Sequence, residues 1–285
     1  MTVLVTGATG TTGSAVVAEL VAHGIPVRAA SRSPEKLPGL ARPGVEPVVL
    51  DRADEASLRT ALQGVAAAYL VTQTSPDMAT TEGAFARAAA EAGVPIVKLS
   101  TLGAAPDSPL RFARAHAAAE AALESAGGAW TVVAPNGFMQ NDLAWAAQVG
   151  SGAVAGPVMD AAWAIVDARD VAAVAAAVLA DPAPYAGRRL AVTGPAARTP
   201  RDRVRALAEV LGRELDAVDL PFAVVAQHLR GLGVPQWQVD GIGELCALYA
   251  AGLATAVAPD AAEVLGRPTR SWEEFATDHA GVFTG

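Results

Sequence analysis

The chain has 285 residues, 52% of them hydrophobic, and carries a formal net charge of −8 at pH 7. This length and composition allow a sizeable buried core and argue against intrinsic disorder. The excess of acidic residues argues against a surface for nucleic acid or an anionic membrane, where lysine and arginine would have to neutralise phosphates.

Cysteine usage, histidine spacing and apolar runs exclude further classes. The single cysteine, Cys246, cannot form an internal disulfide, and the four scattered histidines lack the spacing of zinc ligands, so we expect no metal site. The longest apolar runs, such as residues 171–180, are too short to span a bilayer, and no export signal precedes the first apolar run. We therefore expect a cytoplasmic protein, monomeric or homodimeric, whose partner is a small molecule rather than a nucleic acid or a membrane.

The first half of the chain alternates short Val- and Leu-rich runs with alanine-rich stretches, which indicates a parallel sheet wrapped by helices. Strands are predicted at residues 2–5, 26–30, 47–50, 67–71, 95–100 and 130–134. Helices are predicted at residues 11–22, 54–63, 78–92 and 109–126. Ser108 is expected to cap the last of these helices, with Pro109 in its first turn.

After residue 134 the pattern changes. We predict a strand at 162–167, a helix at 170–179, a strand at 189–194 and then mainly helix, beginning in part at Thr199 and at the capping box 271–274. No internal repeat or linker divides the chain. We therefore predict an α/β fold: a Rossmann-type doubly wound parallel sheet in a single domain, 1–285, with a smaller, mainly helical substrate lobe formed mainly by residues 135–160 and 196–285.

The glycine-rich segment "VLVTGATGTTGSAVV" lies between the first predicted strand and the first predicted helix. Gly7 allows the tight turn, Gly10 lets the backbone approach a pyrophosphate, and Gly13 lets helix and strand pack closely. The amide groups at the helix start would face the anion. The spacing and its context therefore predict a dinucleotide site.

The end of the second strand indicates which dinucleotide is bound. An NAD-selective site usually has an acidic residue there, which holds the ribose 2′-hydroxyl. This chain has Ser31 and Arg32 instead, with Lys36 nearby, and Arg32 can pair with a 2′-phosphate. NADP (as NADPH) is therefore the expected cofactor, although Arg32 and Lys36 could also form an ordinary solvated face.

Further cofactor contacts are expected where the third and fourth strands end, because ligands of such sheets gather at that edge. Asp51 follows the third strand and could meet the adenine, whereas Asp54 is more simply explained as a helix cap. The complete set predicted in this half of the chain is Gly7, Thr9, Gly10, Thr11, Thr12, Gly13, Ser31, Arg32, Lys36, Asp51, Arg52, Val71, Thr72 and Gln73.

Seven segments extend the pattern: residues 6–13, 31–36, 97–104, 116–127, 130–141, 166–179 and 266–275. In these segments the chain resembles the short-chain dehydrogenase/reductase superfamily. Within it, the chain resembles the atypical branch that contains NmrA-like proteins, NAD(P)H-dependent quinone reductases and reductases of aromatic polyketide pathways. The resemblance covers nearly the full length and implies an extended-type Rossmann fold with a C-terminal lobe over the substrate.

The resemblance also implies where the reacting groups lie. The nicotinamide would sit between the end of the fifth strand and the loop of Pro135, Asn136, Gly137 and Phe138. Met139, Gln140 and Asn141 would turn toward the substrate. A Pro-Asn-Gly turn made for geometric reasons alone is the alternative explanation of this loop.

The chain departs from the superfamily in its catalytic residues. Better-known members use a serine after the fifth strand and a Tyr-x-x-x-Lys motif on the next helix, where the tyrosine protonates the carbonyl oxygen. Ser100 or Thr101 can stand for the serine, but the helix has Phe112-x-x-x-His116, and phenylalanine has no proton to donate. None of the three tyrosines and neither of the two lysines completes the usual motif.

Three interpretations of His116 are open. It could itself be the acid, because its ordinary pKa lies near neutrality. It could only orient the ribose or bond Glu120, four residues further along the helix, which is the interpretation we prefer. The site could also be non-catalytic, as in an NmrA-like regulator that senses NADP without reducing a substrate.

Of the two function classes, we favour an NADPH-dependent reductase of an aromatic carbonyl compound, such as a quinone or a polyketide-type ketone. Such a substrate tolerates a transient oxyanion, so a neighbouring phenol or water could supply the proton. Met139, Asn141, Trp145 and His228 are the expected substrate contacts, although each aromatic residue could equally belong to the core. Residues 231–252 are expected to form either a mobile cover or an ordinary two-helix wall.

Overall fold

The computed structural model describes residues 1–284, and its centre is one sheet of seven parallel strands in the order β3-β2-β1-β4-β5-β6-β8. The strands are β1 (Val3–Val5), β2 (Val27–Ser31), β3 (Val45–Val49), β4 (Ala67–Leu70), β5 (Ile96–Leu99), β6 (Trp130–Pro135) and β8 (Arg189–Val192). The order reverses between β1 and β4, so the Rossmann-type sheet predicted from the sequence is confirmed. Ligands of such sheets bind beyond the carboxyl ends of the strands at this reversal.

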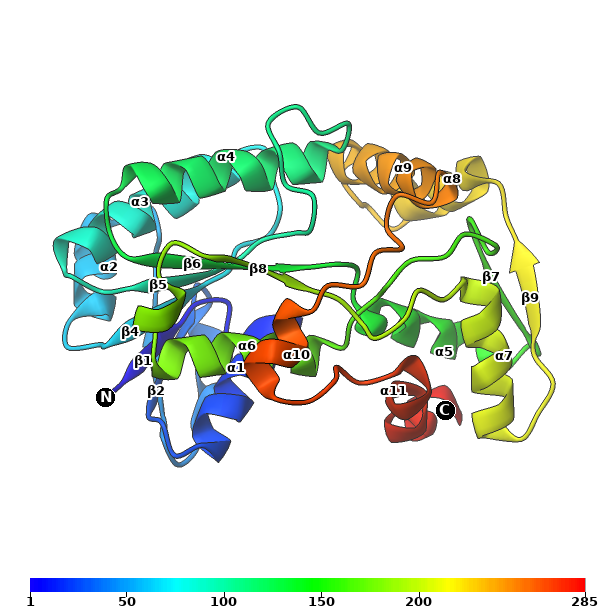
Figure 1. Ribbon diagram of the computed structural model, residues 1–285, viewed down its shortest axis with the longest axis horizontal. Helices are drawn as coiled ribbons and strands as arrows, with labels where there is room; N and C mark the ends of the chain where they lie inside the picture. Colours follow the sequence, from blue (N-terminus) through cyan, green and yellow to red (C-terminus); the bar gives the residue numbers. More distant parts are fainter. Residues whose placement is uncertain (285) are drawn as a thin grey trace.

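Helices cover both faces of the sheet (Figure 1). One face carries α1 (Thr11–Ala22), α6 (Ala168–Ala180) and α10 (Asp260–Leu265), and the other carries α2 (Glu55–Leu62), α3 (Met78–Glu91) and α4 (Arg111–Ser125). The strands are apolar on both sides because both sides are covered. Many of the facing helix residues are alanines, which lets the helices lie close to the sheet and to each other.

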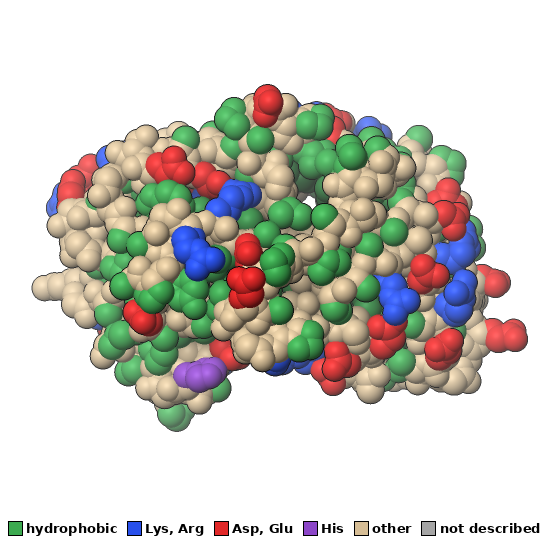
Figure 2. Space-filling model, in the orientation of Figure 1, with side chains coloured by type: hydrophobic (Ala, Val, Ile, Leu, Met, Phe, Trp, Pro, Cys, Tyr) green, Lys and Arg blue, Asp and Glu red, His purple; other side chains and the backbone are tan. Residues whose placement is uncertain are grey.

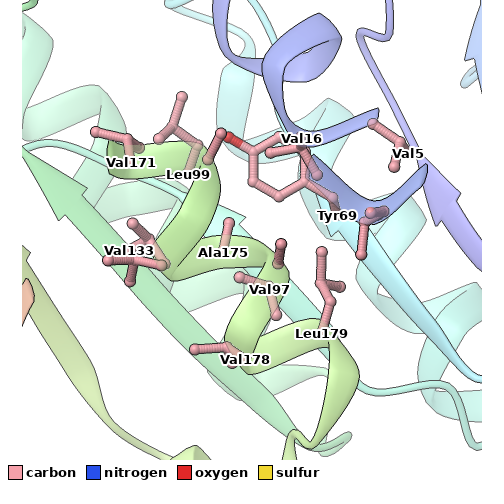
Figure 3. Close-up of a cluster of buried hydrophobic side chains, with 14 of the residues drawn as sticks. Val5, Val16, Tyr69, Val97, Leu99, Val133, Val171, Ala175, Val178 and Leu179 are labelled. Atoms are coloured by element: carbon pink, nitrogen blue, oxygen red, sulfur yellow. The ribbon is translucent and has the colours of Figure 1, made fainter. Parts of the chain in front are cut away.

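The core between the sheet and the α1/α6 layer consists of small aliphatic side chains around one aromatic ring (Figure 3). Val171, Ala175 and Val178 of α6 face Val97 of β5, and Tyr69 of β4 is fully buried among them. Because these α6 residues are spaced four and three positions apart, they lie on one side of the helix, and this side packs on the sheet. This packing fixes the carboxyl ends of β4 and β5, from which the site is built.

A separate group of buried side chains lies beyond the carboxyl ends of the strands. It is built on α5 (Ala146–Val149), α7 (Pro200–Leu211), α11 (Trp272–Asp278) and α12 (Ala280–Thr284), with a parallel strand pair, β7 (Ala153–Gly156) and β9 (Asp216–Asp219). Helix α9 (Gln236–Ala250) lies beside α4, and α8 (Phe222–Gly231) packs against α9 (Figure 1). Four 3-10 helices complete the chain: Pro34–Lys36, Pro38–Leu40, Met139–Trp145 and Ala183–Tyr185.

Several predicted helix boundaries are confirmed. Asp54 caps α2 by accepting from the amide of Ala56, and Asp167 caps α6. Thr199 and Ser271 each form the predicted capping box, at α7 and α11. In the described residues, 1–284, no helix combines the length and apolar character needed to cross a bilayer.

Two predicted features are wrong. Residues 162–167 do not form a strand: Val166 makes one bridge with Phe138, Trp163 makes another with Arg198, and β8 occupies the position beside β6. The helix predicted from 109 begins at Arg111, and Ser108 is not its cap. The amide of Arg111 instead donates to Oε2 of Glu244 on α9, at 2.7 Å, so a residue far along the chain satisfies the helix end.

Candidate functional site

The glycine-rich turn joins β1 to α1 at the point where the strand order reverses. Gly7 has φ of +59°, a left-handed conformation that side chains disfavour, and a Cβ atom at Gly13 would lie 2.1 Å from the carbonyl oxygen of Gly7. No side chain at Gly13 could be accommodated there. The turn and the close helix approach predicted for these two glycines are therefore confirmed.

The amino end of α1 has no side-chain cap. Its N-cap residue is Gly10, and its first turn contains no acidic residue. Amide groups at this end are left without helical partners and carry the positive end of the helix dipole. An anion such as a pyrophosphate fits this position.

A cavity of about 540 Å³ opens above the glycine turn, and we name it the glycine-turn cavity. It brings together most of the residues predicted to bind the cofactor. Those that line it are Gly7, Thr9, Gly10, Thr11, Thr12, Ser31, Arg32, Lys36, Arg52, Val71, Thr72, Gln73 and Phe138. Of the predicted set, Gly13, Asp51, Pro135, Asn136 and Gly137 do not line it. Gly13 is buried in the helix contact, and the carboxylate of Asp51 accepts from the amide of Ala53 at 2.9 Å. The three loop residues line a second cavity, described below.

Three cations line the glycine-turn cavity. Arg32 and Lys36 are exposed, and Arg52 is half-buried. Burial, followed by the charge of Arg32, lowers the pKa of Arg52. An anionic group placed among these side chains would relieve their mutual repulsion, and no carboxylate lines this cavity.

A second cavity, of about 510 Å³, lies between the loop after β6 and helices α4 and α9, and we name it the α4–α9 cavity. Figure 2 shows the surface hollowed near the middle of this face, with hydrophobic side chains around the hollow. The two cavities share Thr72, Gln73, Thr74, Leu99 and Phe138. A ligand that fills the glycine-turn cavity can therefore reach a ligand in the α4–α9 cavity at this junction.

The loop after β6 is held in place by its own amide side chain. Nδ2 of Asn136 donates to the carbonyl oxygen of Ala254 at 3.1 Å, and Oδ1 accepts from the amide of Gly137 at 2.8 Å. Pro135, Asn136, Gly137 and Phe138 all line the α4–α9 cavity. The geometric explanation of the turn therefore holds for Asn136, and the loop also forms part of the cavity wall.

Only one of the four predicted substrate contacts, Asn141, lines the α4–α9 cavity. Met139 and Trp145 belong to the separate core beyond the sheet, where Trp145 packs on Trp272. His228 is exposed on α8. These three expectations are wrong for this cavity. The 3-10 helix after Phe138 turns Met139 and Trp145 into that core, and His228 faces solvent from α8.

Phe112 lines the α4–α9 cavity but also packs across it. Its ring lies 5.2 Å from that of Trp237, and a Cβ atom at Gly241 would lie 2.3 Å from its Cζ. Arg111 reinforces this contact through Glu244, with an Nε–Oε1 distance of 3.0 Å. Residues 231–252 were expected to form either a mobile cover or a two-helix wall. Helix α9 forms a wall that is attached directly to the start of α4.

His116 is 7% exposed and lines the same cavity. Its Nε2 is 3.2 Å from Oγ1 of Thr74, and its Nδ1 has no partner among residues 1–284. Burial, and then the charges of Lys98 and Arg189, lower the pKa of His116 to about 3. His116 is therefore neutral at pH 7. This contradicts the first interpretation, in which a protonated His116 is the catalytic acid.

Ser100 is buried and its hydroxyl donates to Oε1 of Glu120. Oε2 of Glu120 accepts from Arg189 on β8. The predicted bond between His116 and Glu120 is therefore wrong, because Glu120 is turned toward Ser100 and Arg189. With its one proton engaged by Glu120, Ser100 lines the cavity as a hydrogen-bond acceptor.

Lys98 is fully buried under this part of the site. Its Nζ lies 2.8 Å from Oε2 of Glu82, which is also fully buried, and the other carboxylate oxygen accepts from Oγ1 of Thr72 at 2.7 Å. The pair joins β5, α3 and the loop after β4. Lys98 does not line either cavity, so it cannot replace the lysine of the usual motif.

The phenol that α9 contributes to this cavity was not predicted from the sequence. Tyr249 lines the α4–α9 cavity beside Asn136 and Gly137, and its ring stacks on Trp163 at 4.2 Å with an interplanar angle of 3°. The apolar side chains Ile242, Leu245 and Leu248 lie on the same wall. Tyr249 belongs to no sequence motif, and only the fold places it opposite the loop after β6.

The model of the NmrA-like family matches residues 1–276. The chain belongs to this family. As a member of the NmrA-like family it is 38% identical over 286 residues to the (4-alkanoyl-5-oxo-2,5-dihydrofuran-3-yl)methyl phosphate reductase of Streptomyces griseus, with 99% of each chain covered. It is 35% identical over 283 residues to the NAD(P)H azoreductase of Xenophilus azovorans, again with 99% of each covered.

A solved structure of the Escherichia coli NADPH-dependent quinone oxidoreductase QOR2, in complex with NADPH, has the same fold as this NmrA-like chain. The TM-score is 0.85 at 28% identity, and the match covers 98% of this chain and 99% of that one. The resemblance to the atypical dehydrogenase/reductase branch is thereby confirmed.

Proposed function

We propose that this protein is an NADPH-dependent reductase that transfers hydride to a carbonyl group of an aromatic small molecule of the quinone or polyketide-ketone kind. The observation that carries the proposal is the junction of the two cavities at Leu99, Phe138 and Gln73. A dinucleotide can lie in one cavity while a flat apolar substrate lies in the other. The similarity to enzymes named as azoreductase, quinone oxidoreductase and furanone phosphate reductase supports the same reaction class.

The residues of the glycine-turn cavity fit NADPH, which supplies the hydride when bound. The uncapped amino end of α1 takes the pyrophosphate, and Arg32, Lys36 and Arg52 take the 2′-phosphate. The loop of Pro135 to Phe138, together with Leu99, positions the ring at the junction of the two cavities.

The substrate part of the site is assigned to residues 135–160 and 196–285 in this proposal. Helix α9 contributes an apolar wall, and the lining of the α4–α9 cavity contains no aspartate, glutamate, lysine or arginine. Such a wall suits a neutral aromatic compound. The proton that completes the reduction cannot come from Phe112, so it comes from the substrate's own hydroxyl, from water or from another part of the wall.

The test is NADPH oxidation by the purified chain with 1,4-naphthoquinone, 1-tetralone and 8-hydroxy-1-tetralone. Turnover of any of these supports the proposal, and a faster reaction of the hydroxylated ketone than of 1-tetralone would indicate substrate-assisted protonation. Tight NADPH binding without turnover of quinones, ketones or azo dyes would contradict the proposal and favour a sensing role. We further propose that the protein acts in the cytoplasm, where NADPH and reduced thiols such as Cys246 coexist.

A further inference from the structure

The α4–α9 cavity contains a phenol that the usual motif does not predict. We propose that Tyr249 of α9 donates the proton to the substrate oxygen, so that the catalytic acid comes from the wall opposite α4. This inference rests on the proposed reductase function. The usual Tyr-x-x-x-Lys motif would place the acid on α4, where this chain has Phe112, whereas our proposal places it on α9.

The hydroxyl of Tyr249 is placed at the loop expected to hold the nicotinamide. A Cβ atom at Gly137 would lie 3.1 Å from Oη of Tyr249, so the hydroxyl approaches the bare backbone of that loop. The side chain is 7% exposed and lines the cavity. A carbonyl oxygen that lies over the loop is therefore within hydrogen-bond reach of this hydroxyl.

Tyr249 forms no hydrogen bond that would occupy its proton within residues 1–284. By contrast, the hydroxyl of Ser100 is engaged by Glu120, and His116 lies with Nε2 on Thr74. Burial raises the pKa of Tyr249, so the phenol keeps its proton until an oxyanion forms. Of these three side chains, Tyr249 is the one with both a free proton and a position at the loop.

A buried cation lies behind Tyr249. The guanidinium of Arg203, 2% exposed, lies 4.6 Å from the ring centre of Trp163, and Trp163 stacks on Tyr249. The charge of Arg203 lowers the pKa of Tyr249 against the effect of burial. Asp142, 2.7 Å from the guanidinium, neutralises part of this charge. Arg203 is thus a positioning residue that favours the phenolate formed after proton donation.

The proposed step is balanced as follows. As the carbonyl carbon accepts hydride, the carbon–oxygen π bond breaks and its electron pair moves to oxygen. The oxygen forms a bond to the proton of Tyr249 as the Oη–H bond breaks, which leaves a phenolate. Water at the cavity mouth then returns a proton to Tyr249, so the net reaction consumes one hydride and one proton per carbonyl.

The test compares wild type with Tyr249→Phe, which keeps the ring stack on Trp163 and loses only a hydroxyl that has no hydrogen-bond partner among residues 1–284. We expect kcat to fall by about 10²-fold with 1-tetralone and by about tenfold with 1,4-naphthoquinone, because the quinone oxyanion is less basic. The KM for NADPH should not change. In wild type kcat should be level from pH 6 to 9, whereas in Tyr249→Phe it should fall about tenfold per pH unit, since hydronium then supplies the proton.

Two measurements complete the test. Tyr185→Phe removes a phenol that does not line the cavity and should leave kcat unchanged. The infrared carbonyl stretch of bound 1,4-naphthoquinone, recorded without cofactor, should lie at lower frequency in wild type than in Tyr249→Phe because of the phenol hydrogen bond. If wild type reduces quinones or ketones and Tyr249→Phe matches it in kcat, pH profile and carbonyl frequency, the inference is overturned while the proposed function stands. If wild type reduces none of them, the proposed function itself fails.

Discussion

The ring of Phe112 lies against Gly241 so closely that a methyl group on Gly241 would be 2.3 Å from its Cζ. Phe112 occupies the helix position that corresponds to the tyrosine of the Tyr-x-x-x-Lys motif, and its para carbon points at the α9 backbone. The absence of a hydroxyl at this position therefore permits the contact that joins α4 to α9. The contact also explains why the acid has to be sought elsewhere in the cavity.

Phe112→Tyr is expected to impair the protein rather than restore the usual motif. The added hydroxyl extends from Cζ toward Gly241, and overpacking of this kind costs about 1–3 kcal/mol. No lysine lines the α4–α9 cavity to lower the pKa of the new phenol. We expect a lower midpoint in thermal unfolding and no gain in kcat with 1-tetralone, and a clear gain in kcat would contradict this account.

Gly241→Ala tests the same contact from the other side. The new methyl group must displace the Phe112 ring, so we expect a loss of about 1–3 kcal/mol in urea unfolding and a higher KM for the aromatic substrate. Gly231→Ala is the matched control, because Gly231 ends the neighbouring helix α8 and has open space around it. Equal stability of the two variants would contradict this prediction, because it would show that α9 shifts to accommodate the methyl group.

Much of the cofactor half could be predicted from the sequence, because its determinants are local. Gly7 and Gly13 act within one turn, and their roles follow from spacing alone. The substrate half depends on contacts between distant residues: Glu244 caps the amide of Arg111 across 133 positions, and Tyr249 meets Gly137 through the fold. No local pattern marks these pairs, and the helix cap at Ser108 was mispredicted for that reason.

The choice of cofactor should depend on Arg32. Arg32→Ala would remove the charge-assisted contact that we propose for the 2′-phosphate. Such a contact is worth about 1.5–3 kcal/mol, so the KM for NADPH should rise by roughly 10–100-fold. The KM for NADH, which has no 2′-phosphate, should change little. Arg59→Ala on α2, a surface arginine paired with Glu55, is the control. Similar KM changes for both cofactors would assign Arg32 to the solvated surface instead.

His116 should make the protein less stable in acid. Its pKa is lowered to about 3 in the folded protein by burial, against a usual value of 6.5 in the unfolded chain. Between these two pKa values the unfolded state binds more protons than the folded state. The free energy of unfolding therefore falls as the pH decreases below 6.5, and the contribution of His116 is fully retained above that pH.

His116→Gln removes this contribution. The difference in unfolding free energy between wild type and His116→Gln should be constant above pH 7 and should decline steadily from pH 6.5 toward pH 4. His23→Gln, at an exposed position, serves as the control. A difference that does not vary with pH would mean that the pKa of His116 is the same in the folded and the unfolded protein.

The ion pair of Arg203 and Asp142 is buried, and breaking it from one side should be costly. Arg203→Met leaves the carboxylate with Nε1 of Trp272 as its remaining partner, and such a change costs about 3–5 kcal/mol. Arg203→Met/Asp142→Asn removes both charges and should recover most of that loss in urea unfolding. If Arg203 also favours the Tyr249 phenolate, both variants should lower kcat more than they raise KM. No recovery in the double variant would indicate that packing of the Arg203 side chain, rather than its charge, is what matters.

Four of the five α9 residues that line the α4–α9 cavity, Gln238, Ile242, Leu245 and Tyr249, follow one another at intervals of four, three and four positions, and therefore form a single stripe along the helix. Substrate fit and proton delivery would therefore be encoded together in one segment of twelve residues, separate from the segments that hold the hydride donor. A library of variants confined to residues 238–249 could change which substrate is accepted without altering the residues of the dinucleotide half. For the same reason, a cassette exchanged there between family members would carry its own acid with it, or would leave the recipient without one.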